Sequence, residues 1–361
     1  MDIEEAAQQA VEMLDSAGSA HAEHRLDDAV VLARRAAAIF FEVDGPSSPD
    51  GANALMTAAD ALAERSADDD LADAAALYGR AATVLVDFAG DQGGPLDVLT
   101  LRALRGVGTM ARLQARYADA ATAFASALER AERGFGPESP EAGYVCNDLG
   151  VLGKFTAAFD DAARWYERAL AIVEATAGPR SSDAATLHHN LAGLAHSRQR
   201  STEGLASGRL SVEIRRELLG DDHVHVAADL ANLGGLLLDV GDIDEAEACF
   251  EAARATYERA LGSDHIEVAI AWNNLAAVAR DRGDSATAEA LYRRALELKT
   301  SALGMTHPST LITAVNLAYL VDDETEAVAL LHRAVDGLTG VVGDDDRTLA
   351  AARQGLADRA G

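Results

Sequence analysis

Residues 265–298 read HIEVAIAWNNLAAVARDRGDSATAEALYRRALEL, and this stretch decides the fold of the chain. Weaker copies of it recur along the sequence with a step of 42 residues. The step is marked by glycines at Gly94, Gly136, Gly178, Gly220, Gly262 and Gly304, followed by Gly343 after a step of 39. A second series consists of Leu149, Leu191, Leu233, Leu275 and Leu317. Self-similarity at a fixed period of this size predicts a solenoid of repeated helical units.

One copy departs from the pattern. Aromatic residues occupy the same place in four copies, at Phe124, Tyr166, Phe250 and Tyr292, but Gly208 stands there in another. Gly204 lies four residues earlier in the same predicted helix. Because glycine has no side chain to pack and lowers helix stability, residues 201–212 are predicted to exchange amide hydrogens faster than the matching helices on either side.

The decisive stretch resembles a tetratricopeptide repeat. It matches the pattern W-x2-L-G-x2-Y followed by A-x3-F at Trp272, Leu275, Ala276, Ala279, Ala288 and Tyr292. The 42-residue step, the Asn-Asn-Leu-Ala run and the Gly-x-x-His lead-ins at Gly220, Gly262 and Gly304 are most similar to the kinesin-light-chain-like subclass of bacterial type. The resemblance implies an all-α fold, a right-handed α-α superhelix of about eight helical hairpins with a C-terminal capping helix.

Apolar spacing predicts where the helices lie, because Val226, Leu230, Leu233 and Leu237 recur at steps of three and four and share one face. First helices of the regular units are expected at 95–114, 138–157, 181–198, 222–240, 264–282 and 306–321. Second helices are expected at 117–134, 159–176, 201–218, 243–260, 285–302 and 324–339. Two earlier pairs are expected at 3–23 with 26–42 and at 52–66 with 70–89.

Three regions follow from this pattern. Residues 1–90 are predicted to be divergent N-terminal helical-hairpin repeats, residues 91–343 the regular array, and residues 344–361 the C-terminal capping helix. Each unit buries its apolar face only against its neighbours, so the array is expected to behave as one cooperative rod.

Composition narrows the classes of partner. The 361 residues are 49% apolar and only 5% aromatic, and alanine, which favours helix, dominates. The formal net charge of -28 argues against nucleic acid and anionic membranes as partners, since both bind basic patches. Such a charge keeps an exposed solenoid soluble, and a basic partner is the alternative explanation.

Cysteines and the N-terminus indicate the compartment. Cys146 and Cys249 lie in different repeats and are expected to pack as small apolar residues without a disulfide. The acidic start Met1-Asp-Ile-Glu-Glu lacks the features of a signal peptide, and no apolar run of about 20 residues is present. A cytoplasmic location is expected.

No motif in the sequence indicates catalysis, a cofactor or a metal. Residues 150–155 (GVLGKF) lack the spacing of a phosphate-binding loop, and the repeats leave no stretch long enough for a catalytic domain. His223, His265 and His307 open successive first helices. They have no Cys or carboxylate partners at ligand spacing, so each is expected to bond the turn at its helix start.

A candidate binding groove is predicted from helix geometry. The residue before each leucine of the 42-residue series lies roughly 130° from the middle of the packing face, at about 100° per residue. These residues are Asp148, Asn190, Asn232, Asn274 and Asn316. The resemblance implies that asparagines here grip the backbone of an extended peptide, because a carboxamide both donates and accepts hydrogen bonds. The alternative is that they bond neighbouring helices and hold the repeat angle.

Aromatic and charged residues are expected to complete the groove. Tyr144, Phe155 and Tyr319 offer aromatic surface. Arginines lie near one end and aspartates near the other, a field that suits a peptide with an acidic and a basic end; these residues are Arg102, Arg105, Asp239, Asp281 and Asp323.

The sequence therefore predicts a non-catalytic scaffold or adaptor that binds a protein or an extended peptide in its concave groove. The alternative is a regulatory or sensor subunit that controls an effector enzyme, such as a protease or signalling ATPase, as the resemblance to bacterial arrays of this subclass implies. An enzyme with a hidden active site is a third hypothesis, for which no segment of the chain is left over.

Overall fold

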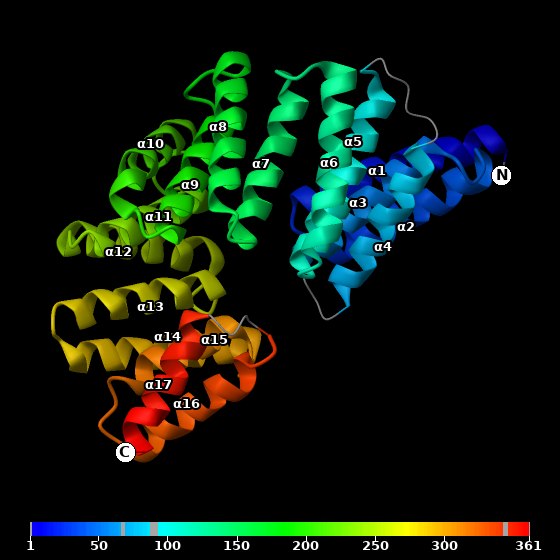
Figure 1. Ribbon diagram of the computed structural model, residues 1–361. Coiled ribbons are helices and arrows are strands. Elements are labelled where there is room, and N and C mark those ends of the chain that lie inside the picture. The colour runs from blue at the N-terminus through cyan, green and yellow to red at the C-terminus, as the bar shows by residue number, and fades with distance from the viewer. Residues whose placement is uncertain (1, 66–68, 87–92, 342–345, 361) are drawn as a thin grey trace. The chain divides into compact units, whose positions relative to one another are not determined.

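The computed structural model describes residues 2–65, 69–86, 93–341 and 346–360. All seventeen elements within these residues are α-helices (Figure 1). The predicted all-α fold of paired helices is confirmed.

The helices alternate between first and second members of hairpins. The first helices are α1 (Ile3–Ala22), α3 (Pro49–Arg65), α5 (Pro95–Leu113), α7 (Pro140–Phe155), α9 (Ser182–Ser197), α11 (Val224–Asp239), α13 (Ile266–Asp281) and α15 (Pro308–Ala318). The second helices are α2 (Leu26–Val43), α4 (Asp70–Val86), α6 (Tyr117–Phe135), α8 (Phe159–Thr176), α10 (Ser201–Leu219), α12 (Ile243–Leu261), α14 (Ser285–Leu303) and α16 (Glu324–Leu338), and α17 (Arg347–Ala360) ends the chain.

Several first helices are shorter than predicted at both ends. The start of α7 is Pro140 rather than residue 138, because Ser139 has an extended backbone and caps the helix with its side chain. His223, His265 and His307 cap α11, α13 and α15 in the same way. The residues before each cap belong to the turn, which apolar periodicity does not reveal.

The chain forms two compact units, residues 1–187 and residues 188–361. The division falls inside α9, between Leu187 and His188. The expected cooperative behaviour of the array stays a prediction. The predicted region boundaries at residues 90 and 343 lie outside the described residues and stay predictions.

Glycine–aromatic contacts bring the helices of a hairpin close together. A Cβ atom on Gly234 of α11 would lie 2.7 Å from Cε1 of Phe250 on α12, so the ring packs directly against the backbone. Gly108 with Phe124, and Gly150 with Tyr166, repeat this contact in α5–α6 and α7–α8. The aromatic rings are therefore buried in the hairpin cores rather than in a groove.

In the repeat that contains Gly208, other side chains replace the aromatic ring. A Cβ atom on Gly208 of α10 would lie 3.3 Å from Cδ1 of both Leu233 and Leu236, and 3.7 Å from Cβ of Ala192. Two leucines of the next first helix thus occupy the space beside Gly208, where other repeats place an aromatic ring.

Most of the periodic glycines end a second helix with a positive φ. The angle lies between 82° and 99° at Gly136, Gly178, Gly220, Gly262 and Gly304, a region that a side chain rarely adopts. Gly94 is an exception, because its φ of -82° belongs to an extended residue before α5. Gly343 lies outside the described residues.

The last helix closes unit 2. Leu349 and Ala352 of α17 are buried in the same core as α15 and α16. The Tyr319 hydroxyl, at the end of α15, donates a 2.8 Å hydrogen bond to the Ala351 carbonyl. The predicted capping helix is present in residues 347–360.

Candidate functional site

Four predicted groove asparagines lie half-buried on successive first helices of unit 2. They are Asn190 on α9, Asn232 on α11, Asn274 on α13 and Asn316 on α15. Asn232, Asn274 and Asn316 each precede a buried leucine of the 42-residue series, whereas Asn190 precedes the half-buried Leu191, and none of the four is part of the apolar core. This placement suits either of the two roles predicted for them.

Asn232 has a structural partner. Its Nδ2 donates a 2.9 Å hydrogen bond to the carbonyl of His189 on α9 and so ties two successive first helices together. This is the bond expected if the asparagines hold the repeat angle. The Asn232 carboxamide oxygen and its second N–H are left for other contacts.

Asn274 and Asn316 differ from Asn232, because no described residue bonds to either carboxamide. On α15, Ile312, Asn316 and Tyr319 are four and three residues apart and therefore share one face. Ile312 is 41% exposed and Tyr319 is 48% exposed. The α13–α15 part of unit 2 thus combines unbonded amides with exposed apolar surface.

A buried ionic cluster lies under the α9–α11 part of the same face. Asp229 of α11 is only 1% exposed. Its Oδ1 lies 2.7 Å from Nδ1 of His189, and its Oδ2 lies 2.7 Å from Nε of Arg215 on α10. A buried carboxylate is tolerated only with such partners, so this cluster fixes α9, α10 and α11 to one another.

In unit 1 the predicted groove charges are paired with each other. Arg105 of α5 binds both carboxylate oxygens of Asp148 on α7, with Nη2 3.2 Å from Oδ1. Burial raises the pKa of the Asp148 carboxyl, and the Arg105 guanidinium opposes that rise. Arg102 bonds Asp60 and donates a 2.9 Å hydrogen bond to Asn53 on α3.

The predicted aromatic residues are exposed but engaged. Arg105 stacks on the Tyr144 ring at 5.4 Å from its centroid, and the Tyr144 hydroxyl lies 3.2 Å from Oδ2 of Asp183. Arg112 stacks on the Phe155 ring at 4.8 Å. Phe155 is 55% exposed and keeps its other face open to solvent.

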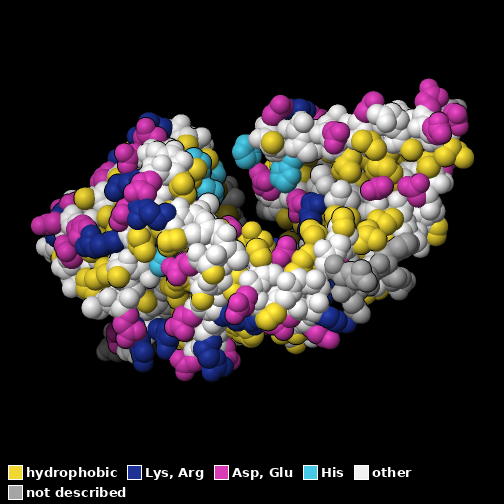
Figure 2. All heavy atoms as spheres, turned by 90° about the horizontal axis from the view of Figure 1, so that it is seen from above, with side chains coloured by type: hydrophobic (Ala, Val, Ile, Leu, Met, Phe, Trp, Pro, Cys, Tyr) yellow, Lys and Arg dark blue, Asp and Glu magenta, His cyan; other side chains and the backbone are white. Residues whose placement is uncertain are grey.

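Each aspartate expected at the acidic end has a local partner. Asp239 accepts a 2.5 Å hydrogen bond from Ser201, Asp281 lies 2.8 Å from Nη2 of Arg280, and Asp323 caps α16 by accepting from the Thr325 N–H at 2.9 Å. Over part of the face shown in Figure 2, basic side chains likewise stand next to acidic ones. Local structure therefore accounts for these charges without a charged peptide.

The histidines that open first helices act as caps. Nδ1 of His223, His265 and His307 accepts the backbone N–H of the residue two positions later, at 3.1, 3.2 and 3.1 Å. The predicted turn bond is confirmed at all three. Among the described residues, no group of three His, Cys, Asp or Glu side chains is placed to hold a metal ion.

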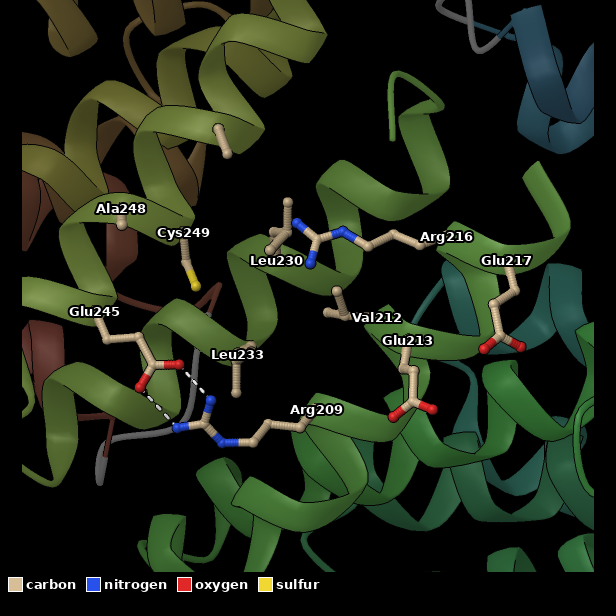
Figure 3. A pocket seen from close by; sticks show the side chains of 11 residues that line it. Arg209, Val212, Glu213, Arg216, Glu217, Leu230, Leu233, Glu245, Ala248 and Cys249 are labelled. Carbon is tan, nitrogen blue, oxygen red and sulfur yellow. Dashed lines mark hydrogen bonds and ion pairs between the residues drawn. The ribbon is translucent and has the colours of Figure 1, made fainter. Parts of the chain in front are cut away.

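Sequence reasoning missed a pocket on the second-helix side of unit 2 (Figure 3). It measures about 450 Å³ and lies between α10 and α12, with Val212, Leu230, Leu233 and Cys249 among its apolar walls. The Arg209–Glu245 ion pair crosses its rim. Residue size gave no clear signal, because Cys249 matches Trp165 and Leu291 in two repeats but Ala123 and Ser207 in two others.

Comparison with known proteins identifies the family. A family profile described as Tetratricopeptide repeat matches residues 99–175, 183–259, 226–301 and 267–322. The chain belongs to the tetratricopeptide repeat family. Solved structures of similar fold include repeat proteins described as kinesin light chains.

BtubC (BKLC) from P. vanneervenii is 22% identical, with a TM-score of 0.56 over 66% of this chain and 94% of that one. TPR-like repeats described as kinesin light chain repeats from Podosopora anserina are 20% identical, with a TM-score of 0.47 over 56% and 97%. A Rap protein complexed with competence and sporulation factor is 15% identical, with a TM-score of 0.55 over 98% of each chain. These likenesses concern the fold. The search of curated proteins found no match.

Hydropathy gives one further constraint. None of the helices in the described residues combines the length and the apolar character needed to cross a bilayer.

Proposed function

We propose that this tetratricopeptide protein is a non-catalytic binding module that takes an extended peptide segment on the first-helix face of unit 2. The observation that supports this best is the pair of half-buried carboxamides, Asn274 and Asn316, to which no described residue bonds, together with the exposed Ile312 on the same face of α15 as Asn316. Half-buried amides without partners forgo hydrogen bonds that water supplies only in part. A peptide backbone offers both a donor and an acceptor to each of them.

Asn232 and Asn274 have different tasks under this proposal. Asn232 holds α9 and α11 together through the His189 carbonyl, whereas Asn274 and Asn316 contact the ligand. Tyr144, Phe155, Arg105, Asp148 and Asp281 are already engaged within the chain. In the proposal none of them grips the peptide, and Tyr144, Phe155, Arg105 and Asp148 belong to unit 1.

The test uses a random peptide library displayed on phage, selected on the intact chain. Selected peptides are then titrated against N274A/N316A by calorimetry. The double substitution removes up to about four hydrogen bonds of about 0.5–1.5 kcal/mol each, so affinity should fall by about one to four orders of magnitude. The melting temperature should stay unchanged, because neither carboxamide bonds a described residue.

The matched control is N232A. It removes the bond to the His189 carbonyl and should lower the free energy of unfolding by about 1 kcal/mol with a smaller effect on affinity. Unchanged peptide affinity in N274A/N316A would falsify the proposed contact surface, and the pocket between α10 and α12 would be the next surface to test.

A regulatory subunit is the second candidate function. It is favoured by the Rap protein complexed with competence and sporulation factor, which matches along 98% of both chains. A pull-down from the native cell separates the two candidates. One stoichiometric enzyme in the eluate supports the regulator, whereas enrichment of short peptide segments or their parent proteins without such an enzyme supports the scaffold.

A further inference from the structure

The residue that caps successive first helices changes type along the chain. Ser139, Ser181, His223, His265 and His307 occupy this place at steps of 42 residues. Oγ of Ser139 and Ser181 accepts the N–H of Ala142 and Ala184, each at 3.2 Å. The three histidines do the same task with Nδ1 at 3.1–3.2 Å.

Only one protonation state of histidine can form this bond. A backbone N–H can only donate, so Nδ1 must carry no proton and the ring must be neutral with its hydrogen on Nε2. A second proton, on Nδ1, would make the ring nitrogen a donor that faces the backbone N–H donor. It would also place a positive charge at the positive end of the helix dipole, so both effects oppose the capped helix. A serine cap has no such dependence.

We infer that α11, α13 and α15 form an acid-sensitive segment whose helix starts weaken together when the three cap histidines take up a proton, while α7 and α9 keep their serine caps. Imidazole ordinarily titrates near pH 6.5. Since the unfolded chain then binds protons that the capped helix refuses, this part of the stability is full above about pH 6.5 and is lost as pH falls below it.

Charged groups surround the three cap histidines. His223 follows Asp221 and Asp222, which pair with Arg216 and Arg259, and its ring lies 5.0 Å from the His225 ring. Burial lowers the pKa of His225, and Arg215 of α10 and His223 act in the same direction, against Asp229.

His265 stands between Asp264 and Glu267, and Tyr257 of α12 faces Glu267. His307 is exposed and opens a helix without acidic or basic residues in its first turn, and Lys299 of α14 donates to the Ser309 carbonyl at 3.3 Å. His307 is the most exposed of the three.

The segment includes Asn232, Asn274 and Asn316. If the proposed function holds, a bound peptide would therefore be released on acidification. The acid sensitivity itself does not depend on peptide binding and is measured without a ligand, so either idea can fail while the other stands.

The experiment is residue-resolved hydrogen exchange of the intact chain at about pH 7.5 and about pH 5.5, with each rate divided by its intrinsic rate. Between the two conditions the amides of His225, Glu267 and Ser309 should lose about fivefold protection, the equivalent of a cap worth about 1 kcal/mol. The amides of Ala142 and Ala184, bonded to serine caps, are the internal control and should keep theirs.

The variant H223S/H265S/H307S installs the cap that the chain already uses elsewhere and should abolish the difference. If the triple variant does not fold, H307S tests the most exposed site alone and should protect the Ser309 amide only. Equal losses of amide protection at histidine-capped and serine-capped helices, or a loss of protection that persists in the serine variants, would overturn the inference.

Discussion

Lys299 shows how a single buried charge shapes this protein. Its side chain is 3% exposed and its ammonium donates to Thr313 Oγ1 at 3.0 Å and to the Ser309 carbonyl at 3.3 Å. Burial lowers its pKa from the ordinary 10.5 to about 8. Thr313 in turn donates to Oδ1 of Asn273 at 2.9 Å, so a polar chain joins α13, α14 and α15.

The depressed pKa of Lys299 predicts that its own contribution to stability rises in alkali. Between about pH 8 and 10.5 the unfolded chain holds a proton on Lys299 that the folded chain has released, so the free energy of unfolding should increase with pH relative to that of K299M, by up to about 3 kcal/mol. K299M should lack this increase and should be more stable than the parent at neutral pH. Urea unfolding of both proteins from neutral pH to about pH 10.5 checks this; parallel pH profiles would contradict it.

Residue-level detail was predictable only where it is local. The histidine caps follow from position, since a histidine before a helix can bond only the turn that follows it. Lys299 and the Arg215–Asp229–His189 cluster could not be predicted, because their partners come from other helices. Likewise, nothing local distinguishes Asn232, which has a partner, from Asn274, which has none among the described residues.

At the level of the element, the structure gives the two glycines of α10 a role that the sequence alone did not indicate. Sequence reasoning treated Gly204 and Gly208 as losses of helix stability. The structure shows that both are buried and that space beside them is limited: a Cβ on Gly204 would lie 2.8 Å from Cβ of Ala195 and 3.2 Å from the Ala192 carbonyl oxygen. The glycines therefore let α10 approach α9 closely. Faster exchange of residues 201–212 stays a prediction.

This contact predicts opposite outcomes for two Gly-to-Ala substitutions. G204A should destabilise the chain by about 1–3 kcal/mol despite the better helix propensity of alanine, because Ala195 and the Ala192 carbonyl must move. G79A in α4 is the control, since nothing lies within 4 Å of a Cβ there. It should stabilise by about 0.5–1 kcal/mol. Denaturant unfolding of both variants decides; stabilisation by G204A would show that α9 yields at little cost.

At the level of the whole molecule, the repeat predicted the order, type and approximate length of the helices. A 42-residue period with an apolar face every three or four residues admits few other folds. It did not predict the division into residues 1–187 and 188–361. Each repeat packs only on its neighbours, so the continuity of the array depends on each junction, and the division falls in the hairpin that lacks the aromatic ring.

The two buried cysteines allow the rate at which each unit opens to be measured separately. Cys146 on α7 lies in unit 1 and is fully buried, whereas Cys249 on α12 lies in unit 2 and is 7% exposed in the wall of the pocket. Burial raises the pKa of Cys146 to about 11 and also raises the pKa of Cys249, so little of the reactive thiolate exists while the helices are packed.

A disulfide reagent added to the native protein therefore reacts with each cysteine at the rate at which the unit that contains it opens. C249A and C146A separate the two reactions without a foreign label. We expect Cys249 to react first, because it borders a pocket and follows the glycine-containing α10. A single shared rate would instead mean that both units open in one event, and the two thiols would then report the same opening rate.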